Sequence, residues 1–228
     1  MKRFVLLLLT SLFPIYSFAQ KDVTTFLGIP VDGFKKEMRQ KLIEKGFTPA
    51  TGSNTDVLEG EFNGTDVNLF IGTNNNKVYR IMVCDAHARN EIDIKIRFNN
   101  LVRQFENNKR YTTFDQYIIP EEEDISYEIL VHKKKYEALF YQTPDMSQID
   151  TLALKTKVKD LLLEKYSLEQ IENPTEALAL EIQSEALKVG LDLVFKKPVW
   201  FIISEHFGEY YITMFYDNVY NQANGEDL

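Results

Sequence analysis

Few side chains in this sequence are spaced for covalent or metal chemistry, and the most suggestive pair is a cysteine and a histidine. Cys84 and His87 are separated by two residues. A thiol beside an imidazole can become an activated thiolate or supply half of a tetrahedral metal site. Cys84 is the only cysteine of the chain, so no second Cys/His pair completes such a site. We favour a buried cysteine at a strand end followed by a polar turn, with a hydrolase built on Cys84 and His87 as the alternative.

Carboxylates offer a second route to a hydrolase. Glu59 and Glu61 fall on the same face of a predicted strand, and Asp56 lies beside them. Two carboxylates at such spacing can act as the acid and the nucleophile or base of a glycoside hydrolase. Such pairs are also common on exposed strand faces, and we favour that interpretation.

Possible metal ligands are present without a metal-binding pattern. The acidic run at residues 121–124 lacks the alternate spacing and central glycine of a known calcium loop, so a solvated turn is favoured. His87, His132 and His206 fall at predicted strand ends or turns, and their spacing does not direct them to one zinc ion. The sequence contains no Gly-rich phosphate loop, nucleophile elbow or HExxH motif. We therefore predict no catalytic residues, no metal and no cofactor.

The candidate binding residues are aromatic and lie near the C-terminus. Trp200 falls on one predicted strand, and Tyr210, Tyr211 and Tyr216 fall on the next. An exposed cluster of such rings is a typical binding surface. We predict that these four residues bind a ligand, such as a sugar or a peptide. The alternative is that alternate aromatic residues pack the core of two strands.

The elements that position these residues follow from the spacing of apolar side chains. Apolar residues at every third or fourth position predict helices, and alternation predicts strands. The expected helices run from a cap at Asp32 to Gly46, over residues 91–107 and 152–166, and from the Asn173-Pro174 cap to a stop at Gly190. The expected strands are residues 57–62, 67–71, 78–84, 111–119, 125–132, 135–142, 191–195, 199–205 and 210–216, with a hairpin turn at Asn63-Gly64.

A helix followed by about three antiparallel strands thus occurs three times. This organisation predicts an α+β fold, with antiparallel sheet built from helix-then-three-strand units and helices packed on one face. No Gly/Ser/Pro-rich linker divides the chain. We expect residues 20–228 to form a single domain, with a possible sub-boundary near residues 143–150.

The first nineteen residues predict export. Lys2 and Arg3 precede a mostly apolar run, and Ser17 and Ala19 place small residues at a signal peptidase site. This is a Sec-type signal peptide over residues 1–19. The mature protein is therefore expected in the periplasm or outside the cell. No later apolar run approaches the about 20 residues of a membrane helix, so we expect no stable membrane insertion.

Composition narrows the class of partner. The chain carries 26 Lys+Arg against 34 Asp+Glu, a net charge of −8, which disfavours binding to nucleic acid. Its 44% hydrophobic and 13% aromatic residues are typical of a globular protein. The lone cysteine cannot form an internal disulfide, so packing alone must hold the fold.

Five motifs carry a resemblance to a known family. They are residues 26–33 (FLGIPVDG) before a helix ending in 45–47 (KGF), 78–83 (VYRIMV), 97–107 (RFNNLVRQFEN), 216–218 (YDN) and 224–228 (NGEDL). These motifs resemble a family of exported proteins from Bacteroides and relatives, and the resemblance covers nearly the whole mature chain. The family has no established function, so it implies no catalytic residues. The organisation is also similar to that of the beta-lactamase inhibitor protein and the small outer-membrane assembly lipoproteins, which implies a binding role.

The expected function is a non-catalytic binding or interaction module in the periplasm or outside the cell. Its partner would be a protein, a peptide or a glycan of the cell envelope or the exterior. Two alternatives stay open: an exported hydrolase using Cys84 and His87 or the strand carboxylates, and a cell-envelope assembly or structural accessory acting through an exposed strand edge.

Overall fold

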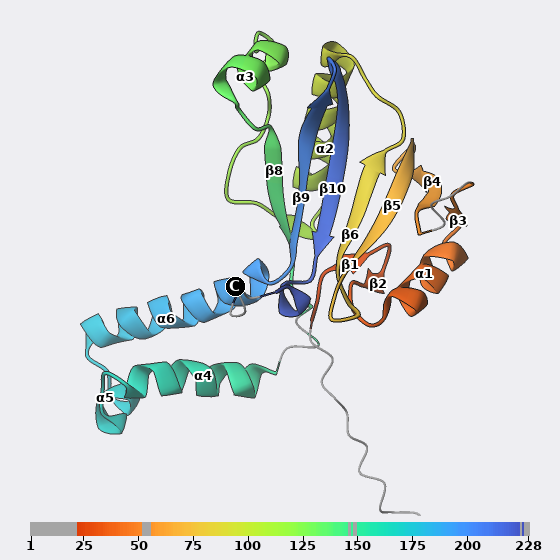
Figure 1. Ribbon diagram of the computed structural model, residues 1–228. Coiled ribbons are helices and arrows are strands. Elements are labelled where there is room, and N and C mark those ends of the chain that lie inside the picture. The colour runs from red at the N-terminus through yellow and green to blue at the C-terminus, as the bar shows by residue number, and fades with distance from the viewer. Residues whose placement is uncertain (1–21, 52–55, 146, 148–149, 224, 226–228) are drawn as a thin grey trace, which may run out of the picture.

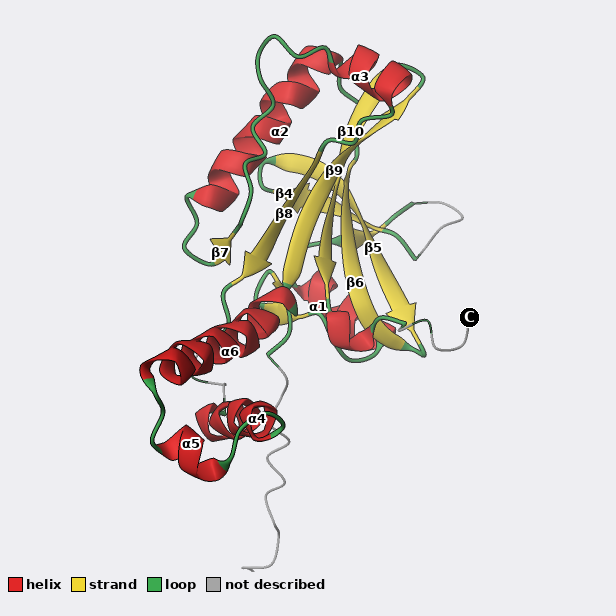
Figure 2. Ribbon diagram, turned by 90° about the vertical axis from the view of Figure 1, so that its left-hand side faces the viewer, coloured by secondary structure: helices red, strands yellow, loops and turns green. Residues whose placement is uncertain are grey.

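The computed structural model describes residues 22–51, 56–145, 147, 150–223 and 225 (Figure 1). An antiparallel sheet of eight strands forms the body of the protein, and helices pack against it. A group of helices extends from one end of the sheet as an arm (Figure 1, Figure 2). The predicted α+β class, with an antiparallel sheet and packed helices, is confirmed. The predicted signal peptide, residues 1–19, lies outside the described residues.

The sheet has the strand order β3-β4-β5-β6-β10-β9-β8-β7, and every neighbouring pair is antiparallel. The central strands are long and the two edge strands are short, which limits pairing with other chains. A separate ribbon precedes the sheet and consists of β1 (Thr25–Phe26) and β2 (Ile29–Pro30). The sheet strands are β3 (Thr48–Pro49), β4 (Leu58–Phe62), β5 (Thr65–Asn74), β6 (Lys77–Asp85), β7 (Tyr111–Thr112), β8 (Glu137–Gln142), β9 (Pro198–His206) and β10 (Glu209–Asp217).

Two helices cover one face of this sheet, and both match the sequence prediction. They are α1 (Lys35–Glu44) and α2 (Glu91–Glu106). Asn90 caps α2 by accepting a hydrogen bond from the backbone N–H of Asp93. The cap of α1 differs from the prediction. Its N-cap is Phe34, and Asp32 instead accepts a hydrogen bond from the N–H of Gly33 at 2.7 Å.

The hairpin between β4 and β5 also forms as predicted. Asn63 and Gly64 have φ angles of 53° and 71°, the left-handed conformation that these two residue types adopt most readily. β6 then pairs with β5 and completes an antiparallel meander. This hairpin matters later, because its turn lies against α2: Asn63 Nδ2 donates to Gln104 Oε1 at 2.7 Å.

Residues 125–132 are a helix, and their prediction as a strand is wrong. They form α3 (Ile125–His132), which begins at a cap made by Asp124. Ile125 is fully buried, and Ile129, one helical turn later, packs against the same core. A side-chain cap and apolar residues at i and i+4 together outweigh the strand preference of the isoleucine and valine residues in this segment.

Two further predicted strands are shortened or absent. Residues 111–119 contribute only the two residues of β7. Residues 191–195 are the last turns of helix α6 (Glu176–Phe195), because Gly190 does not end that helix. The final residue, Phe195, packs its ring against Phe114 and Tyr141, with ring centroids 5.7 Å and 5.1 Å apart, which holds these turns against the sheet. Helix-then-three-strand units therefore describe the chain only in part.

The arm consists of α4 (Thr151–Leu163), α5 (Leu168–Glu172), which was not predicted, and α6. It enters the chain between β8 and β9, directly after the predicted sub-boundary near residues 143–150. Several of its leucines are exposed, including Leu152, Leu180 and Leu187. Within the described residues, no helix combines the length and apolar character needed to cross a membrane.

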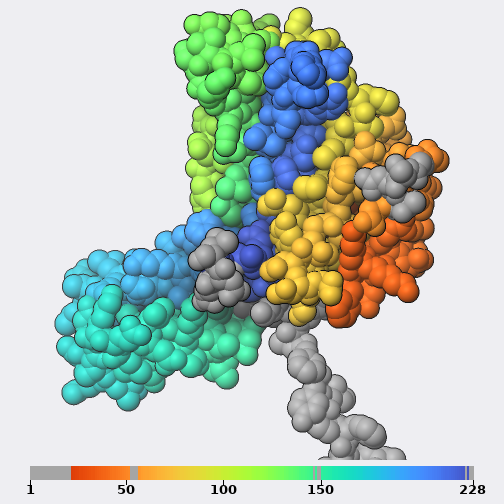
Figure 3. All heavy atoms as spheres, in the orientation of Figure 1, coloured from red at the N-terminus to blue at the C-terminus, as the bar shows by residue number. Residues whose placement is uncertain are grey.

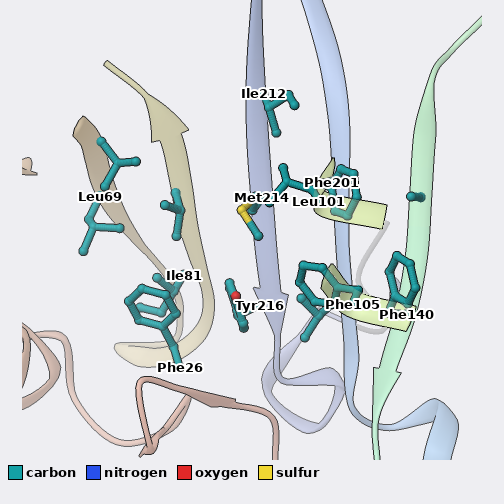
Figure 4. Close-up of a cluster of buried hydrophobic side chains, with 14 of the residues drawn as sticks. Phe26, Leu69, Ile81, Leu101, Phe105, Phe140, Phe201, Ile212, Met214 and Tyr216 are labelled. Atoms are coloured by element: carbon teal, nitrogen blue, oxygen red, sulfur yellow. The ribbon is translucent and has the colours of Figure 1, made fainter. Parts of the chain in front are cut away.

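The core lies on the helix-covered face of the sheet (Figure 4). Phe201 of β9 stands at its centre, with ring centroids 5.1 Å from Phe98, 5.6 Å from Phe105 and 6.1 Å from Phe140. Phe98 and Phe105 come from α2, so these rings join the helix to the strands. We call this side the covered face.

Candidate functional site

The four predicted binding residues divide between the two faces of the sheet. Tyr210 and Tyr216 point into the covered face and are only 2% and 3% exposed. Trp200 and Tyr211 point to the opposite side and are partly exposed. Side chains alternate along a strand, so neighbours such as Tyr210 and Tyr211 cannot share a face. The structure therefore brings no single cluster of four together.

The side opposite the covered face carries a continuous row of apolar side chains. The strand register places Phe70, Met82, Phe215, Trp200 and Leu139 directly beside one another across β5, β6, β10, β9 and β8. All five are partly exposed. We call these five residues the apolar row and the side that bears them the open face. In a sheet with one solvated face, these positions are ordinarily polar.

No described helix packs across the middle of the open face. α2 lies behind the sheet in Figure 1 and on one side of it only in Figure 2. Figure 3 shows that atoms of the central strands form the surface on this side. The arm and α3 lie at the two ends of the sheet rather than over it (Figure 1).

Trp200 and Phe215 are stacked at the centre of the apolar row. Their ring centroids are 3.9 Å apart, and the ring planes differ by 13°. The guanidinium of Arg80 lies 4.9 Å from the Phe215 centroid and 5.5 Å from the Trp200 centroid. A cation over aromatic faces is held by the negative potential of the rings.

Asp217 fixes this arrangement. It accepts hydrogen bonds from Arg80 Nε at 2.6 Å and Nη2 at 2.7 Å, and from Trp200 Nε1 at 3.1 Å. The hydrogen bond to Asp217 raises the pKa of Arg80 above its ordinary value. Because the two charges neutralise each other, the centre of the open face is aromatic without net charge.

Gly72 leaves room for the side chains of Tyr79 and Arg80 on the neighbouring strand. It pairs with Arg80, and a Cβ atom at Gly72 would lie 3.2 Å from the Tyr79 ring and 3.3 Å from Arg80 Cβ. Arg80, Asp217 and Gly72 were not predicted as site residues. Arg80 and Asp217 meet through the pairing of β6 with β10, which joins residues far apart in the chain and is not visible in local spacing, whereas Gly72 is opposite Arg80 in the β5–β6 pair.

A second row crosses the open face beside the apolar row. It consists of Glu59, Asn68, Cys84, Thr213, Ile202 and Glu137, in the order in which the strands pair. Its centre holds small or apolar side chains. Its two ends carry carboxylates, and both glutamates are exposed. The open face therefore carries negative charge at both ends of this row.

Cys84 and His87 do not form the pair that a thiol hydrolase needs. Cys84 accepts a hydrogen bond from Thr213 Oγ1 at 3.5 Å, and burial raises the pKa of its thiol. An activated thiolate requires a lowered pKa. His87 is 77% exposed at its side chain and lies 3.5 Å from Asp66.

The other candidate chemistries are likewise separated in space. His132 lies against Glu128, and His206 packs against the ring of Phe207. In the acidic run, Glu123 is bound by Lys134 and Tyr136, and Asp124 caps α3. In the part of the chain that the structure describes, no group of three or more metal-binding side chains is placed to hold an ion.

Comparisons with known proteins do not assign this chain to a family. No family model matches the chain, and no match is found among curated proteins or among solved structures. The resemblance to the Bacteroides family stays a prediction, and function must be argued from the geometry.

Proposed function

We propose that this protein is an exported, non-catalytic binding module that docks a partner protein on the open face. The observation that carries the proposal is the apolar row, five side chains from five different strands in one line. Water alone would favour polar residues at these positions. A contiguous apolar patch that a fold does not need for its own core is typical of an interaction surface.

The shape of the surface favours a protein over a small ligand. Neighbouring strands are about 4.8 Å apart, so a row across five strands extends for roughly 19 Å. Small ligands are ordinarily enclosed in concave pockets. Tryptophan and arginine are the side chains that most often dominate the energy of protein interfaces, and Trp200 and Arg80 stand together here.

Charge indicates the kind of partner. The Arg80–Asp217 pair leaves the centre neutral, whereas Glu59 and Glu137 border the face with negative charge. The complementary surface would have an apolar centre and lysine or arginine residues at its rim. Such a partner would be met in the periplasm or outside the cell if the signal peptide directs export as predicted.

Trp200 supplies the test, because it is the only tryptophan of the chain. Proteins of the periplasm, envelope and medium are captured on the immobilised protein, and each captured partner is purified and titrated while Trp200 emission is recorded. Binding should shift the emission. A partner that binds without changing it does not use the open face, and absence of any partner from all three fractions counts against the proposal.

Two matched variants locate the contact. Met82→Glu places a charge within the apolar row and should weaken binding by about a hundredfold, because the charge would be buried unpaired. Ile96→Glu places the same charge at an exposed position of α2, behind the sheet, and should bind like the original protein. Equal binding by both variants would contradict the proposal.

A further inference from the structure

A hollow of about 490 Å³ lies on the covered side, between α2 and the β4–β5 hairpin. Its walls are mainly apolar and include Phe62 of the hairpin, Phe105 of α2 and Tyr216 of β10. Lys45, Glu61 and Asn108 stand among its polar lining residues. We call it the apolar hollow. Its volume falls in the range of small-molecule sites.

A second hollow of about 330 Å³ continues along α2 toward its N-terminus. The two hollows share Asn63, Leu101 and Gln104 as lining residues. The hydrogen bond from Asn63 to Gln104 stands between them. The second hollow is lined mainly by polar side chains, among them Arg89, Arg97 and Asp93, and we call it the polar hollow. Together the two hollows form one groove beside α2 with an apolar part and a polar part.

Arg89 is the side chain of this groove whose ion-pair partner, Asp85, is already hydrogen-bonded to another arginine. Asp85 is buried, and both of its oxygens are taken by Arg97, at 2.7 Å and 2.5 Å. Arg89 Nε lies 3.7 Å from Asp85 Oδ2, too far for a hydrogen bond. Among the described residues, it is the one buried side-chain nitrogen without a hydrogen-bond partner.

Two arginines therefore share the Asp85 carboxylate, and Arg97 holds both of its hydrogen bonds. Asp93 also lines the polar hollow and keeps its negative charge, because Asn90 Nδ2, which donates to it at 2.8 Å, is neutral. The buried Nε of Arg89 is closed to a ligand, but the side chain is 31% exposed and lines the polar hollow, so an anionic group there would accept hydrogen bonds from its terminal nitrogens.

We propose that this groove binds a small molecule with an apolar body and one carboxylate. The apolar body occupies the apolar hollow between Phe62, Phe105 and Tyr216. The carboxylate accepts hydrogen bonds from Arg89 in the polar hollow. This site lies on the opposite side of the sheet from the open face, so it does not depend on the proposed protein docking.

Matched amphiphiles test the proposal by calorimetry. Octanoate, octanol and octylamine share one apolar body and differ in the charge of the head group. Octanoate should bind to the purified protein, and the other two should bind at least about tenfold more weakly, since a charged hydrogen bond contributes that much. Equal binding of octanoate and octanol, or no binding of octanoate, would overturn the assignment.

Variants separate the two parts of the groove. Arg89→Gln should weaken octanoate binding roughly ten- to hundredfold and leave octanol binding unchanged. Arg103→Gln removes an arginine of α2 that lines neither hollow and should have no effect. Asn108→Trp fills the mouth of the apolar hollow from an exposed position and should weaken both ligands.

The outcomes are distinct from those of the docking proposal. Trp200 is not among the residues of either hollow, so octanoate should leave its emission in the original protein unchanged. If Arg89→Gln does not fold, Arg89→Lys retains the charge, loses the planar donors, and should still bind octanoate more weakly. Octanoate binding that neither Arg89 variant alters, or that Asn108→Trp leaves intact, would overturn the proposal.

Discussion

The two faces of the sheet are built from the same strands and have opposite reasons for being apolar. Along β10, Tyr210, Ile212, Met214 and Tyr216 are buried on the covered face, whereas Phe215 between the last two is partly exposed on the open face. The apolar residues of the covered face form the surface against which α2 packs. Among the described residues, no helix packs across the middle of the open face, and Phe195 of α6 reaches only Tyr141 at one end of β8. An apolar side chain on the open face contributes less to folding, so substitutions on the two faces should differ in their effect on stability.

The largest expected difference is between Phe201 and Phe215, which lie on adjacent strands and opposite faces. Phe201→Ala should lower the free energy of unfolding by about 3–5 kcal/mol, because it leaves a cavity among the rings of Phe98, Phe105 and Phe140. Phe215→Ala opens no enclosed cavity and should cost about 1–2 kcal/mol. Urea unfolding followed by circular dichroism measures both. Equal losses would mean that the open face is also part of the structural core.

Next in size is the effect of Asp217, a buried carboxylate on the open face whose partner, Arg80, lies over aromatic rings. Asp217→Asn should cost about 2 kcal/mol, because Arg80 loses its counter-ion while its guanidinium stays partly desolvated. Asp56→Asn is the matched control. It breaks the exposed pair with Lys35 and should leave stability unchanged within the error of the measurement.

A double variant sharpens this result. Replacing both Arg80 and Asp217 with leucine should cost less than Asp217→Asn alone, since no charge is then left unpaired. If the double variant is the less stable of the two, the pair contributes net stability to the open face rather than specificity.

The sequence predicted the elements that depend on local patterns, but it did not predict which residues would share a face of the sheet. α1, α2 and the Asn63-Gly64 hairpin were predictable because apolar spacing and turn residues act locally. Residues 125–132 were mispredicted because their strand-like composition conflicted with a cap at Asp124, and the cap prevailed.

The candidate site was only half visible in the sequence. Aromatic content alone selected Trp200 and Tyr211, which reach the open face, together with Tyr210 and Tyr216, which do not. The alternation of side chains along a strand shows that neighbouring residues lie on opposite faces of the sheet. It does not show which of the two faces the helices cover. Arg80 and Asp217 were missed because strand register brings them together across a long stretch of chain.

Cys84 is a chemical probe of the open face, because its reactivity can be compared between the folded and the unfolded protein. Its thiol lies on the open face, partly buried, and burial raises its pKa. At a given pH, less of it is therefore thiolate, the form that reacts with iodoacetamide. Alkylation of the folded protein should be measurable but slower than in urea, and its pH profile should lie at higher pH than that of the unfolded chain. A thiol that reacts only after unfolding would show that this part of the face is closed to solvent.

The smallest expected difference concerns two adjacent tyrosines. The hydroxyl of Tyr210 is 2.6 Å from Ser126 Oγ, which joins β10 to the start of α3 beneath the covered face. Tyr210→Phe should cost about 1 kcal/mol, because the Ser126 hydroxyl loses a buried partner. Tyr211→Phe removes a hydroxyl on the open face and should leave stability within about 0.5 kcal/mol of the original, since solvent-facing substitutions rarely do more. Thermal unfolding of both variants measures the difference. If Tyr211→Phe is the more destabilising, the Tyr211 hydroxyl must make a structural contact on the open face. The open face would then contribute more to stability than the covered face at this pair of neighbouring residues.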